Sequence, residues 1–282
     1  MYFGFHASSG GKLENLPLIT KKMGGECFQF FARNPYGGKI LPLDPEKVQK
    51  FKTNCRLTKI ENYYIHAPYF INLASRNNRI FYGSIKAIQD DLERVKILGA
   101  KFLVMHVGSA KDYEVKEDAY ERVDKGLREI IGRKKKIPLL LEISAGAGAI
   151  LGSSLEEIAS WLKKFPALSG FCLDTAHGFA SGYDFRQKNE TQTFLHQLEE
   201  KIGREKLKLI HLNDSKSQFN SKSDRHAHLG QGEIGLEGLL ALVKYFWRNK
   251  YSSDIILETP TLEGLVLDLQ ALKTFRQKVL KN

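Results

Sequence analysis

The sequence predicts an α/β fold in which eight strands alternate with helices along the whole chain. Short runs rich in aromatic and aliphatic residues, expected to be strands, occur at 2–6, 27–31, 63–66, 102–106, 138–143, 170–174, 207–211 and 254–258. Longer segments such as SIKAIQDDLERVKILGA and LEGLLALVKYFWRNK separate these runs. In the longer segments apolar residues recur at i, i+3, i+4 and i+7, the spacing that gives a helix one buried face.

The arrangement of these elements favours one closed barrel. Strands that alternate with helices pair in parallel, either in a barrel or in a doubly wound sheet. The chain has 282 residues and contains no Pro/Gly/Ser-rich linker, low-complexity tract or internal repeat. A (β/α)8 barrel, or TIM barrel, typically has about 250 residues. We therefore expect residues 1–282 to form a single-domain TIM barrel.

The charge balance limits the classes of partner. Lys and Arg number 43 against 32 Asp and Glu, which gives a formal net charge of +11. Such an excess favours polyanions through long-range attraction and counterion release, and so permits nucleic-acid binding. No apolar run approaches the roughly 18 to 20 residues that span a bilayer, and the first residues lack the pattern of a signal peptide. We expect no membrane partner.

The three cysteines, Cys27, Cys55 and Cys172, are far apart and form no CxxC pair. An odd number of widely spaced cysteines predicts neither a disulfide framework nor a cysteine zinc site. A reducing, cytoplasmic location fits this cysteine usage best.

Potential metal ligands stand at the ends of six consecutive predicted strands. These strands end YYIH, LVMH, LLLE, FCLD, LIH and IILE. In a TIM barrel the C-terminal strand ends meet at the mouth, where active sites lie. The residues concerned are His66, His106, Glu142, Asp174, His211 and Glu258, and His177 follows Asp174 by three residues.

One histidine on an apolar strand is usually a hydrogen-bonded structural group. Six such residues in equivalent positions favour a metal site, because gathered carboxylates and imidazoles are costly to desolvate without a cation. The segment SKSDRHAHLGQGEIG adds Asp224 and His226, which share one side of an extended segment; by itself this segment is equally compatible with a polar surface loop. Nitrogen and oxygen ligands without thiolate favour zinc, with Mn²⁺ or Fe²⁺ as alternatives, and nine ligands imply more than one ion.

The sequence resembles the endonuclease IV family of apurinic/apyrimidinic endonucleases. The resemblance rests on HAPYFINLA, LDTAHGFASGYDF, HLNDSK and DRHAHLGQGEIG, and it extends from GFHASSGGKL near the start to IILETP near the end. It implies a TIM barrel with three zinc ions at the mouth. By this resemblance, His66 and His106 bind the first ion and Glu142 bridges it to the second. The second ion also takes Asp174, His211 and Glu258, and the third takes His177, Asp224 and His226.

The resemblance also implies a reaction. The family hydrolyses the phosphodiester on the 5′ side of an abasic site in duplex DNA, leaving a 3′-hydroxyl and a 5′-deoxyribose phosphate, in base excision repair. Removal of 3′ blocking groups is a second expected activity. Glu142 is the expected catalytic residue, because it would hold the bridging geometry and orient the nucleophile. We expect a monomer, since the mouth must admit a duplex.

Loops after the second and third strands are expected to recognise the lesion. Asn34, Tyr36, Tyr69 and Phe70 could fill the space left by an extruded abasic nucleotide, whose extrusion costs less than that of a normal base, and Arg225 is expected to contact DNA as well. The chain departs from the family here: Tyr36-Gly37-Gly38 stands where relatives carry Arg and a Trp-containing loop. In EISAGAG, Ile143 and Ala147 replace polar residues, so hydrogen bonds around Glu142 are expected to differ.

Two other functions remain open from the sequence. A metal-dependent sugar isomerase or epimerase on a related barrel would use mixed Glu, Asp and His ligands, but with fewer ions and histidines; a flat, basic rim would favour DNA and a closed small pocket would favour sugar. A non-catalytic DNA-binding barrel is disfavoured, because no expected ligand is missing. The basic segment GRKKKIP precedes a strand and is therefore expected at the barrel bottom, as a solvated turn.

Overall fold

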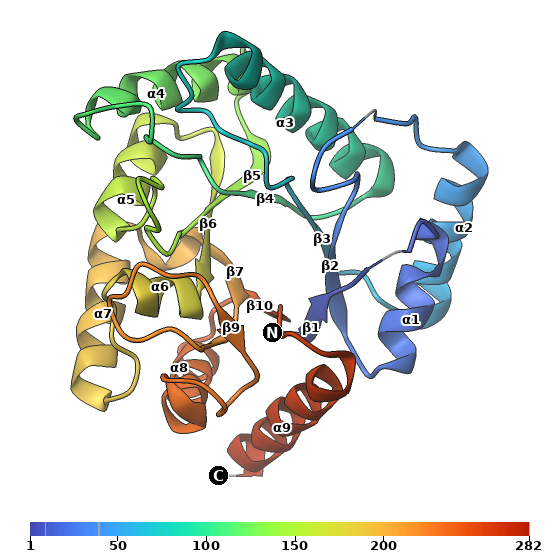
Figure 1. Cartoon of the computed structure of the whole chain (residues 1–282). Helices are drawn as coiled ribbons and strands as arrows, with labels where there is room; N and C mark the ends of the chain where they lie inside the picture. The colour runs from blue at the N-terminus through green and yellow to red at the C-terminus, as the bar shows by residue number, and fades with distance from the viewer. Residues whose placement is uncertain (9, 39, 282) are drawn as a thin grey trace.

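Eight parallel strands close on themselves in the order β1-β10-β7-β6-β5-β4-β3-β2 (Figure 1). This computed structural model describes residues 1–8, 10–38 and 40–281; Ser9, Lys39 and Asn282 lie outside the described residues. The ring is closed by β1 and β10, which pair in parallel with Gly4 opposite Ile256. The closed order confirms the predicted TIM barrel and excludes the doubly wound sheet.

The helices surround the barrel, and one small hairpin stands outside its sheet (Figure 1). The barrel strands are β1 (Phe3–His6), β2 (Cys27–Phe31), β3 (Tyr63–His66), β4 (Leu103–Met105), β5 (Ile137–Glu142), β6 (Leu168–Asp174), β7 (Leu207–His211) and β10 (Asp254–Leu257). The α-helices are α1 (Leu16–Lys22), α2 (Pro45–Thr58), α3 (Asn78–Leu98), α4 (Asp118–Ile131), α5 (Leu155–Lys164), α6 (Thr175–Ser181), α7 (Lys188–Lys201), α8 (Gly235–Arg248) and α9 (Leu262–Lys281). Short 3-10 helices η1 (Leu13–Asn15) and η2 (Arg204–Lys206) precede α1 and β7, and the antiparallel hairpin pairs β8 (Asp214–Ser215) with β9 (His226–Ala227).

The predicted strands agree with the structure, with small differences at their ends. The bounds of 27–31, 63–66 and 207–211 match β2, β3 and β7, and the other strands shift by one or two residues at one or both ends. The largest difference is at β6, which begins two residues earlier than predicted, at Leu168, and so also includes Ser169. Leu168 pairs with Ile137 of β5, and the Ser169 hydroxyl donates to the Ile137 carbonyl at 2.7 Å, so contacts with the neighbouring strand extend β6.

Side-chain caps fix where several helices begin. Asp44 accepts a hydrogen bond from the backbone N–H of Glu46, Asn77 caps α3, and Ser154 caps α5. Such caps satisfy N–H groups that have no partner within the helix. Asp174 caps α6 through the N–H of His177 at 2.8 Å, so that helix begins directly at the end of β6.

The apolar side chains form two separate clusters. The larger lies between the strands and the surrounding helices, and its biggest members include Phe28, Phe51 and Phe246. The smaller takes one residue from each of seven barrel strands, as expected for a layer inside a barrel. Its members are Cys27, Tyr64, Val104, Leu140, Cys172, Leu209 and Ile256. The barrel interior is therefore packed rather than open.

Below that inner layer, a buried carboxylate closes the floor, the end formed by the N-terminal ends of the strands. Asp254 is 2% exposed. It accepts hydrogen bonds from the Tyr64 hydroxyl and the Tyr2 backbone N–H, both at 2.8 Å, and from the Asn62 side-chain amide. These bonds tie β10 to β3 and to the residues that precede β1 and β3.

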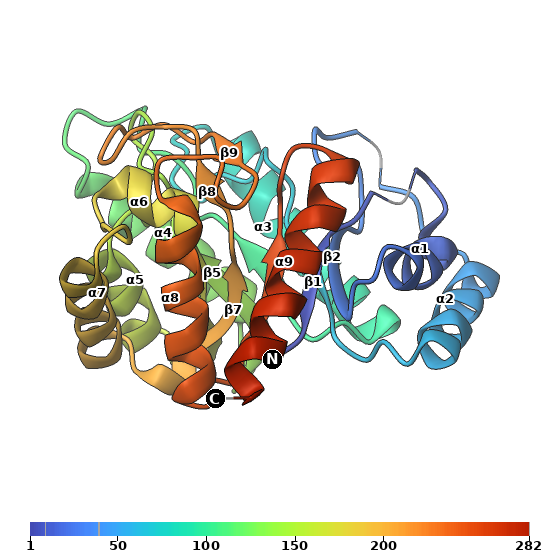
Figure 2. The same cartoon turned by 90° about the horizontal axis from the view of Figure 1, so that it is seen from below.

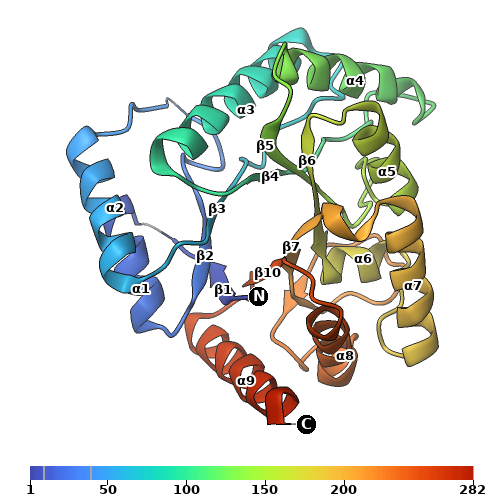
Figure 3. The ribbon, with the colours of Figure 1, turned by 180° about the vertical axis from the view of Figure 1, so that it is seen from behind.

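The mouth and the floor differ in how they are covered. Figure 2 shows the β8–β9 hairpin and the loops that follow the strands at the mouth, and both chain termini near the floor. Figure 3 views the floor, where short turns join the helices to the following strands. The GRKKKIP segment lies there, between α4 and β5, as the sequence predicts. No helix among the described residues is long and apolar enough to cross a membrane.

Candidate metal centre

The strand-end residues singled out in the sequence form the next inward-facing layer above the inner apolar cluster. Side chains on a strand alternate between faces, so residues two positions apart share a face. Two positions beyond Tyr64 and Leu140 in the inner layer stand His66 and Glu142. The same step from the other members leads to Gln29, His106, Asp174, His211 and Glu258. The spacing along each strand therefore places all of these polar side chains at one level of the barrel.

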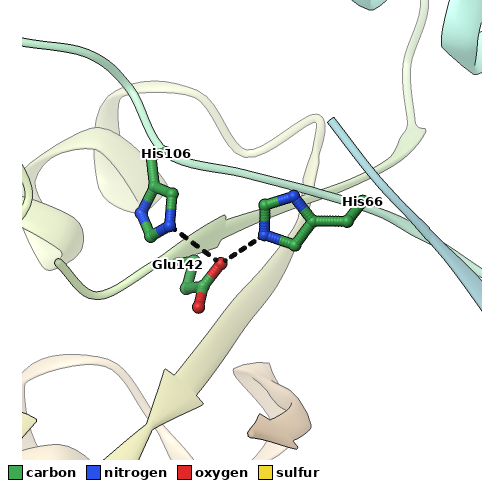
Figure 4. A group of neighbouring side chains, drawn as sticks. All are labelled: His66, His106 and Glu142. Carbon is green, nitrogen blue, oxygen red and sulfur yellow. Dashed lines mark hydrogen bonds and ion pairs between the residues drawn. The ribbon is translucent and has the colours of Figure 1, made fainter. Parts of the chain in front are cut away.

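Glu142 and two histidines form the first group at the mouth. Glu142 is 1% exposed, and its Oε2 lies 2.9 Å from His66 Nε2 and 3.4 Å from His106 Nε2. Figure 4 shows both imidazoles facing the same carboxylate. His66 Nδ1 donates to the Ala67 carbonyl at 2.7 Å, which leaves Nε2 to face the site. Anchoring through one ring nitrogen is the usual way in which proteins orient a metal-binding histidine.

The second group shares Glu142 with the first. His211 Nδ1 lies 2.9 Å from Glu142 Oε1, 3.5 Å from Glu258 Oε2 and 4.0 Å from Asp174 Oδ2. Each of the four residues offers a ligand atom within 4.8 Å of the others'. His211 and Asp174 are fully buried. Three carboxylates and one imidazole therefore meet in a space from which water is largely excluded.

The third group joins α6 to β9 and to the segment just before it. His177 Nε2 and His226 Nε2 each lie 3.2 Å from an oxygen of Asp224. Their Nδ1 atoms face the backbone carbonyls of Ile143 and Glu258, at 3.0 and 3.3 Å. Asp174 also belongs here, because its carboxylate and the two imidazoles fall within 4.8 Å of one another. The structure thus brings the three predicted residues together and places Asp174 between the second and third groups.

The electrostatics of the mouth reflect close packing of opposite charges. Burial opposes ionisation of Glu142, but His106 and His211 hold the pKa of its carboxyl well below the ordinary value. Burial disfavours protonation of His177, yet Asp174 and Asp224 raise its pKa to about 10. Burial lowers the pKa of His106. Carboxylates here are held ionised by protons on neighbouring imidazoles, and a bound cation would replace those protons.

The donor set fits metal ions. Among the described residues, the buried His106 Nδ1 has no hydrogen-bond partner, and the Nε2 atoms of His177 and His226 face the carboxylate of Asp224 at 3.2 Å without hydrogen-bond geometry. Leaving buried polar atoms unpaired is costly, so such atoms are rare in native structures unless water or an ion satisfies them. Imidazole and carboxylate ligands without thiolate are the set that zinc takes. The residues at this mouth could therefore hold several cations.

Cys172 lies beside this set without joining it. Its thiol is close enough to Glu142 and His211 to share a site with them. Burial raises the pKa of the Cys172 thiol to about 12, so it stays protonated and makes a poor metal ligand. The three cysteines are free and buried, as expected from their spacing.

Gln29 and His6 extend the polar layer to the first two strands, and Gln29 was not predicted from the sequence. Gln29 is fully buried; its Nε2 donates to Glu258 at 2.7 Å, and His211 Nε2 lies 3.0 Å from its Oε1. His6 Nδ1 lies 3.0 Å from Glu258 Oε1. A glutamine two positions beyond Cys27, inside the apolar run CFQFF, was the signal that could have revealed it.

Asn213 positions two of the predicted ligands at once. Its side-chain Nδ2 donates to Asp174 Oδ2 at 2.7 Å, and its Oδ1 accepts from the backbone N–H of Glu258 at 2.8 Å. Its own backbone is held by the Thr175 hydroxyl, 2.7 Å from the Asn213 carbonyl. The fully buried amide therefore links the ends of β6 and β10.

Asp214 organises the loop that carries Asp224 and His226. Its fully buried carboxylate accepts from five backbone N–H groups, those of Ser215, Gly230, Gly232, Ile234 and Gly235. A Cβ at Gly232 would lie 2.4 Å from the Ser215 carbonyl oxygen, so only glycine fits at that position. Asp214 thereby closes the segment 215–235 into a loop with fixed ends.

The residues expected to contact DNA lie on the rim of the mouth. Tyr36 is 83% exposed and Tyr69 61% exposed, and their ring centroids are 5.5 Å apart. The exposed Phe70 follows Tyr69. Asn34 accepts from the Tyr36 backbone N–H at 3.0 Å and so holds the turn that presents the tyrosine. Arg225 is exposed beside the metal centre.

The departures in EISAGAG leave the histidine anchors intact. His177 is held by the Ile143 backbone carbonyl, not by its side chain, so a change of side chain at 143 does not remove this bond. Ala147 lines a hollow of about 660 Å³ next to the mouth, together with Tyr69 and Phe70. The cleft over the metal centre itself has about 510 Å³ and reaches the exposed Tyr69 and Arg225. The site is therefore an open cleft with an exposed aromatic rim.

Two histidines outside the predicted set do not take part. His228 Nδ1 lies 2.8 Å from Asp268 and its Nε2 lies 3.0 Å from the Thr261 hydroxyl, contacts that tie the loop before α8 to α9. His196 is exposed on α7. Six of the eight histidines thus lie at the mouth, His6 included.

Comparison with known proteins places these features in a family. Residues 18–275 match the model of the xylose isomerase-like TIM barrel. The chain is 37% identical to the probable endonuclease 4 of Carboxydothermus hydrogenoformans, over 100% of this chain and 98% of the relative. It superimposes on the crystal structure of endonuclease IV from Thermus thermophilus with a TM-score of 0.85 and 32% identity, covering 99% and 100% of the two chains. An L-ribulose 3-epimerase, at 15% identity, a TM-score of 0.69 and coverage of 98% and 96%, shares the fold alone. The chain therefore belongs to the endonuclease IV family, within the xylose isomerase-like TIM barrels.

Proposed function

We propose that the chain is a zinc-dependent endonuclease that hydrolyses the phosphodiester 5′ to abasic sites in duplex DNA, leaving a 3′-hydroxyl and a 5′-deoxyribose phosphate. As a member of the endonuclease IV family it is a DNA-hydrolysing enzyme; the lesion, the products and the metal are our proposal. The observation that carries it is the connected set of imidazoles and carboxylates at the mouth.

Three ions would be held by three groups of residues. His66, His106 and Glu142 would hold the first; Glu142, Asp174, His211 and Glu258 the second; His177, Asp224 and His226 the third. Zinc suits this donor set, and Mn²⁺ or Fe²⁺ could substitute. When bound, such ions supply a Lewis acid for the phosphate oxygens and make a nucleophile available near neutral pH.

Glu142 is the catalytic residue in this proposal. One of its oxygens faces His66 and the other faces His211, each at 2.9 Å, so among the described residues Glu142 is the side chain shared by the first and the second group. Burial on every side fixes its orientation. It would hold the spacing between the two groups and orient the attacking nucleophile.

The rim supplies the DNA contacts. Tyr36, Tyr69 and Phe70 present exposed rings that could fill the space left by an extruded abasic sugar. Asn34 accepts a hydrogen bond from the Tyr36 backbone and so stabilises the turn that carries Tyr36. Arg225 lines the cleft, where it could pair with a DNA phosphate. The ring contact between Tyr36 and Tyr69 supports their acting together.

Several finer assignments belong to the same proposal. Removal of 3′ blocking groups would use the same phosphate chemistry, and both activities would serve base excision repair. The chain would act as one domain and as a monomer, because the open cleft must admit a duplex. The free, buried cysteines support a reducing, cytoplasmic setting.

The test is cleavage of an end-labelled duplex that carries one tetrahydrofuran abasic analogue. Zinc-loaded protein, chelated protein and the Glu142→Gln variant are compared. We expect a single cut 5′ to the lesion that leaves a 3′-hydroxyl, and that requires both metal and Glu142. Circular dichroism of each sample controls for folding.

A folded, zinc-loaded protein that leaves this duplex intact would contradict the proposal. The ketose/aldose interconversion expected of a sugar isomerase on the related barrel would then be assayed on the same preparation. Cleavage that persists in Glu142→Gln would retain the endonuclease but remove Glu142 from its catalytic role.

A further inference from the structure

The positive charge of the chain is concentrated at the floor, not at the mouth. The segments between strand ends and the following helices contain ten basic and ten acidic residues, counting both sides of α6. The segments that join helices to the next barrel strand contain nine basic and only three acidic residues. More than half of the net charge of +11 therefore sits in the short floor turns.

The densest part of this charge is the turn from α4 to β5. Arg133, Lys134, Lys135 and Lys136 are all exposed. Among the described residues, none of them forms an ion pair; the neighbouring Lys164, by contrast, pairs with Asp124. Gly132 ends α4 with a φ of 56°, so the four basic residues lie beyond the helix.

The cluster continues onto η2 and β7, beyond the intervening strand β6. Burial lowers the pKa of Lys208, and so does the proximity of Lys136 and Lys206. Because β5, β6 and β7 are consecutive in the barrel, these lysines belong to one surface, which Figure 3 views. We call Arg133, Lys134, Lys135, Lys136, Lys206 and Lys208 the floor cluster.

Helix dipoles do not account for this surface. All barrel helices direct their C-termini to the floor, where basic residues in the last turn are favoured. That explains Arg128 in α4 and Lys163 in α5. The floor cluster lies outside the helices, where like charges repel, and the charge of Glu205 offsets them only in part, since the pKa of Lys208 stays lowered.

We propose that the floor cluster binds the phosphate backbone of a second DNA duplex while the mouth holds the first. The choice of DNA rests on the proposed function. A polyanion relieves the repulsion and releases counterions. The two ends of the barrel face opposite directions (Figure 2), so both can be occupied together. A membrane surface fits less well, because no large hydrophobic side chain among residues 116–218 is exposed to act as an anchor.

The experiment compares two charge-matched variants of the full-length zinc-loaded protein. Lys134→Glu/Lys135→Glu alters the floor cluster. Lys50→Glu/Lys244→Glu makes the same change in net charge at exposed positions on α2 and α8. The abasic-analogue duplex is immobilised, protein is added, and capture of a second, undamaged, fluorescent duplex is measured over a range of salt concentrations.

We expect the wild type and the control variant to capture the second duplex, and the floor variant to lose about tenfold in capture. The slope of log affinity for the second duplex against log salt should fall by about 2, since each phosphate contact contributes about 0.9. Cleavage of a short abasic duplex should stay within about twofold for both variants.

Equal capture by the two variants would overturn the proposal, as would floor-dependent binding of phosphatidylserine vesicles or single-stranded RNA without binding of duplex DNA. Failure of the proposed function is a separate result: no protein would then cut the abasic duplex, whereas binding of undamaged duplex would still depend on Lys134 and Lys135.

Discussion

The barrel interior buries a carboxylate at each end, in two different ways. At the floor, Asp254 accepts hydrogen bonds from a tyrosine hydroxyl, a backbone N–H and a side-chain amide. These donors are neutral, and the bond to Asp254 satisfies the hydrogen-bonding capacity of each of them. The floor carboxylate is therefore satisfied by the chain alone.

At the mouth, Glu142 stands among imidazoles and next to further carboxylates. His66, His106, His177 and His211 all lie within 3.6 Å of its oxygens. Among the described residues, the buried His106 Nδ1 has no hydrogen-bond partner, and His177 Nε2 and His226 Nε2 share the single carboxylate of Asp224. The difference shows that burial of a carboxylate is not itself a functional sign; an excess of ligand atoms over hydrogen-bond partners is what points to cations.

The largest expected effect comes from removing the ions. Chelation should reduce cleavage of an abasic duplex by about a thousandfold, since metal ions supply several kcal/mol of charge stabilisation in such reactions. It should also lower the free energy of unfolding by about 3 kcal/mol, the value for ligand at about 100 times its dissociation constant. Urea unfolding with and without chelator measures the second effect. If chelation left the urea midpoint of unfolding unchanged, the buried polar groups at the mouth would be stabilised by hydrogen bonds within the chain, as Asp254 is at the floor.

The next effect tests how the mouth is positioned. Asn213→Ala removes the amide that links Asp174 to the backbone of Glu258, so we expect zinc affinity and activity to fall about 10- to 100-fold. Zinc affinity is measured by competition with a chromophoric chelator. Asn249→Ala, which removes an amide from the end of α8 near the floor, is the matched control and should leave zinc affinity unchanged.

Asp214 should affect the third group alone. Asp214→Asn replaces one carboxylate oxygen by a donor that cannot accept from the loop N–H groups, so the loop 215–235 should loosen. We expect one of the three proposed zinc ions to bind about tenfold more weakly and proteolysis within the loop to become faster. A uniform loss of all bound zinc would indicate general unfolding instead.

At the floor, the same kind of change should alter stability without altering catalysis. Asp254→Asn leaves buried donors without an acceptor and should cost about 1–3 kcal/mol in the free energy of unfolding. Activity per folded molecule should stay at the wild-type level. If Asp254→Asn also lowered the zinc content of the folded protein, the floor carboxylate would not be separate in function from the carboxylates at the mouth.

The smallest effect concerns pH. Burial opposes ionisation of Glu26, but Arg276 at 2.9 Å and the Phe3 N–H hold its pKa below the ordinary 4.5. The folded-state pKa is thus below the unfolded one, so the stabilisation is present above about pH 4.5 and is lost as the pH falls through the folded value. Urea unfolding between about pH 3 and 6 should give a shallower pH dependence for Glu26→Gln than for the wild type. Glu61→Gln, at an exposed floor position, is the control and should keep the wild-type pH dependence.

Much of the site could be predicted because strand geometry is local. The apolar runs that end at His66, Glu142 and His211 predict the strands. They also predict which side chains stand two positions beyond the inner apolar layer. Gln29 was missed because a single amide in an apolar strand resembles an ordinary buried polar residue. Asn213 and Asp214 were missed because their partners are 39 and 20 residues away in sequence.

The sequence by itself determined the barrel, the level of the polar layer within it and the type of its ligand atoms. Side chains alternate between faces with a period of two along each strand, and this alternation does not depend on which strands are paired. Only the tertiary structure decided that Asp174 stands between the second and third groups, and that Gln29, Asn213 and Asp214 hold the ligands and their loop in place. Those relations depend on closure of the barrel, which brings strand ends and loops from distant parts of the chain to the same end of the molecule.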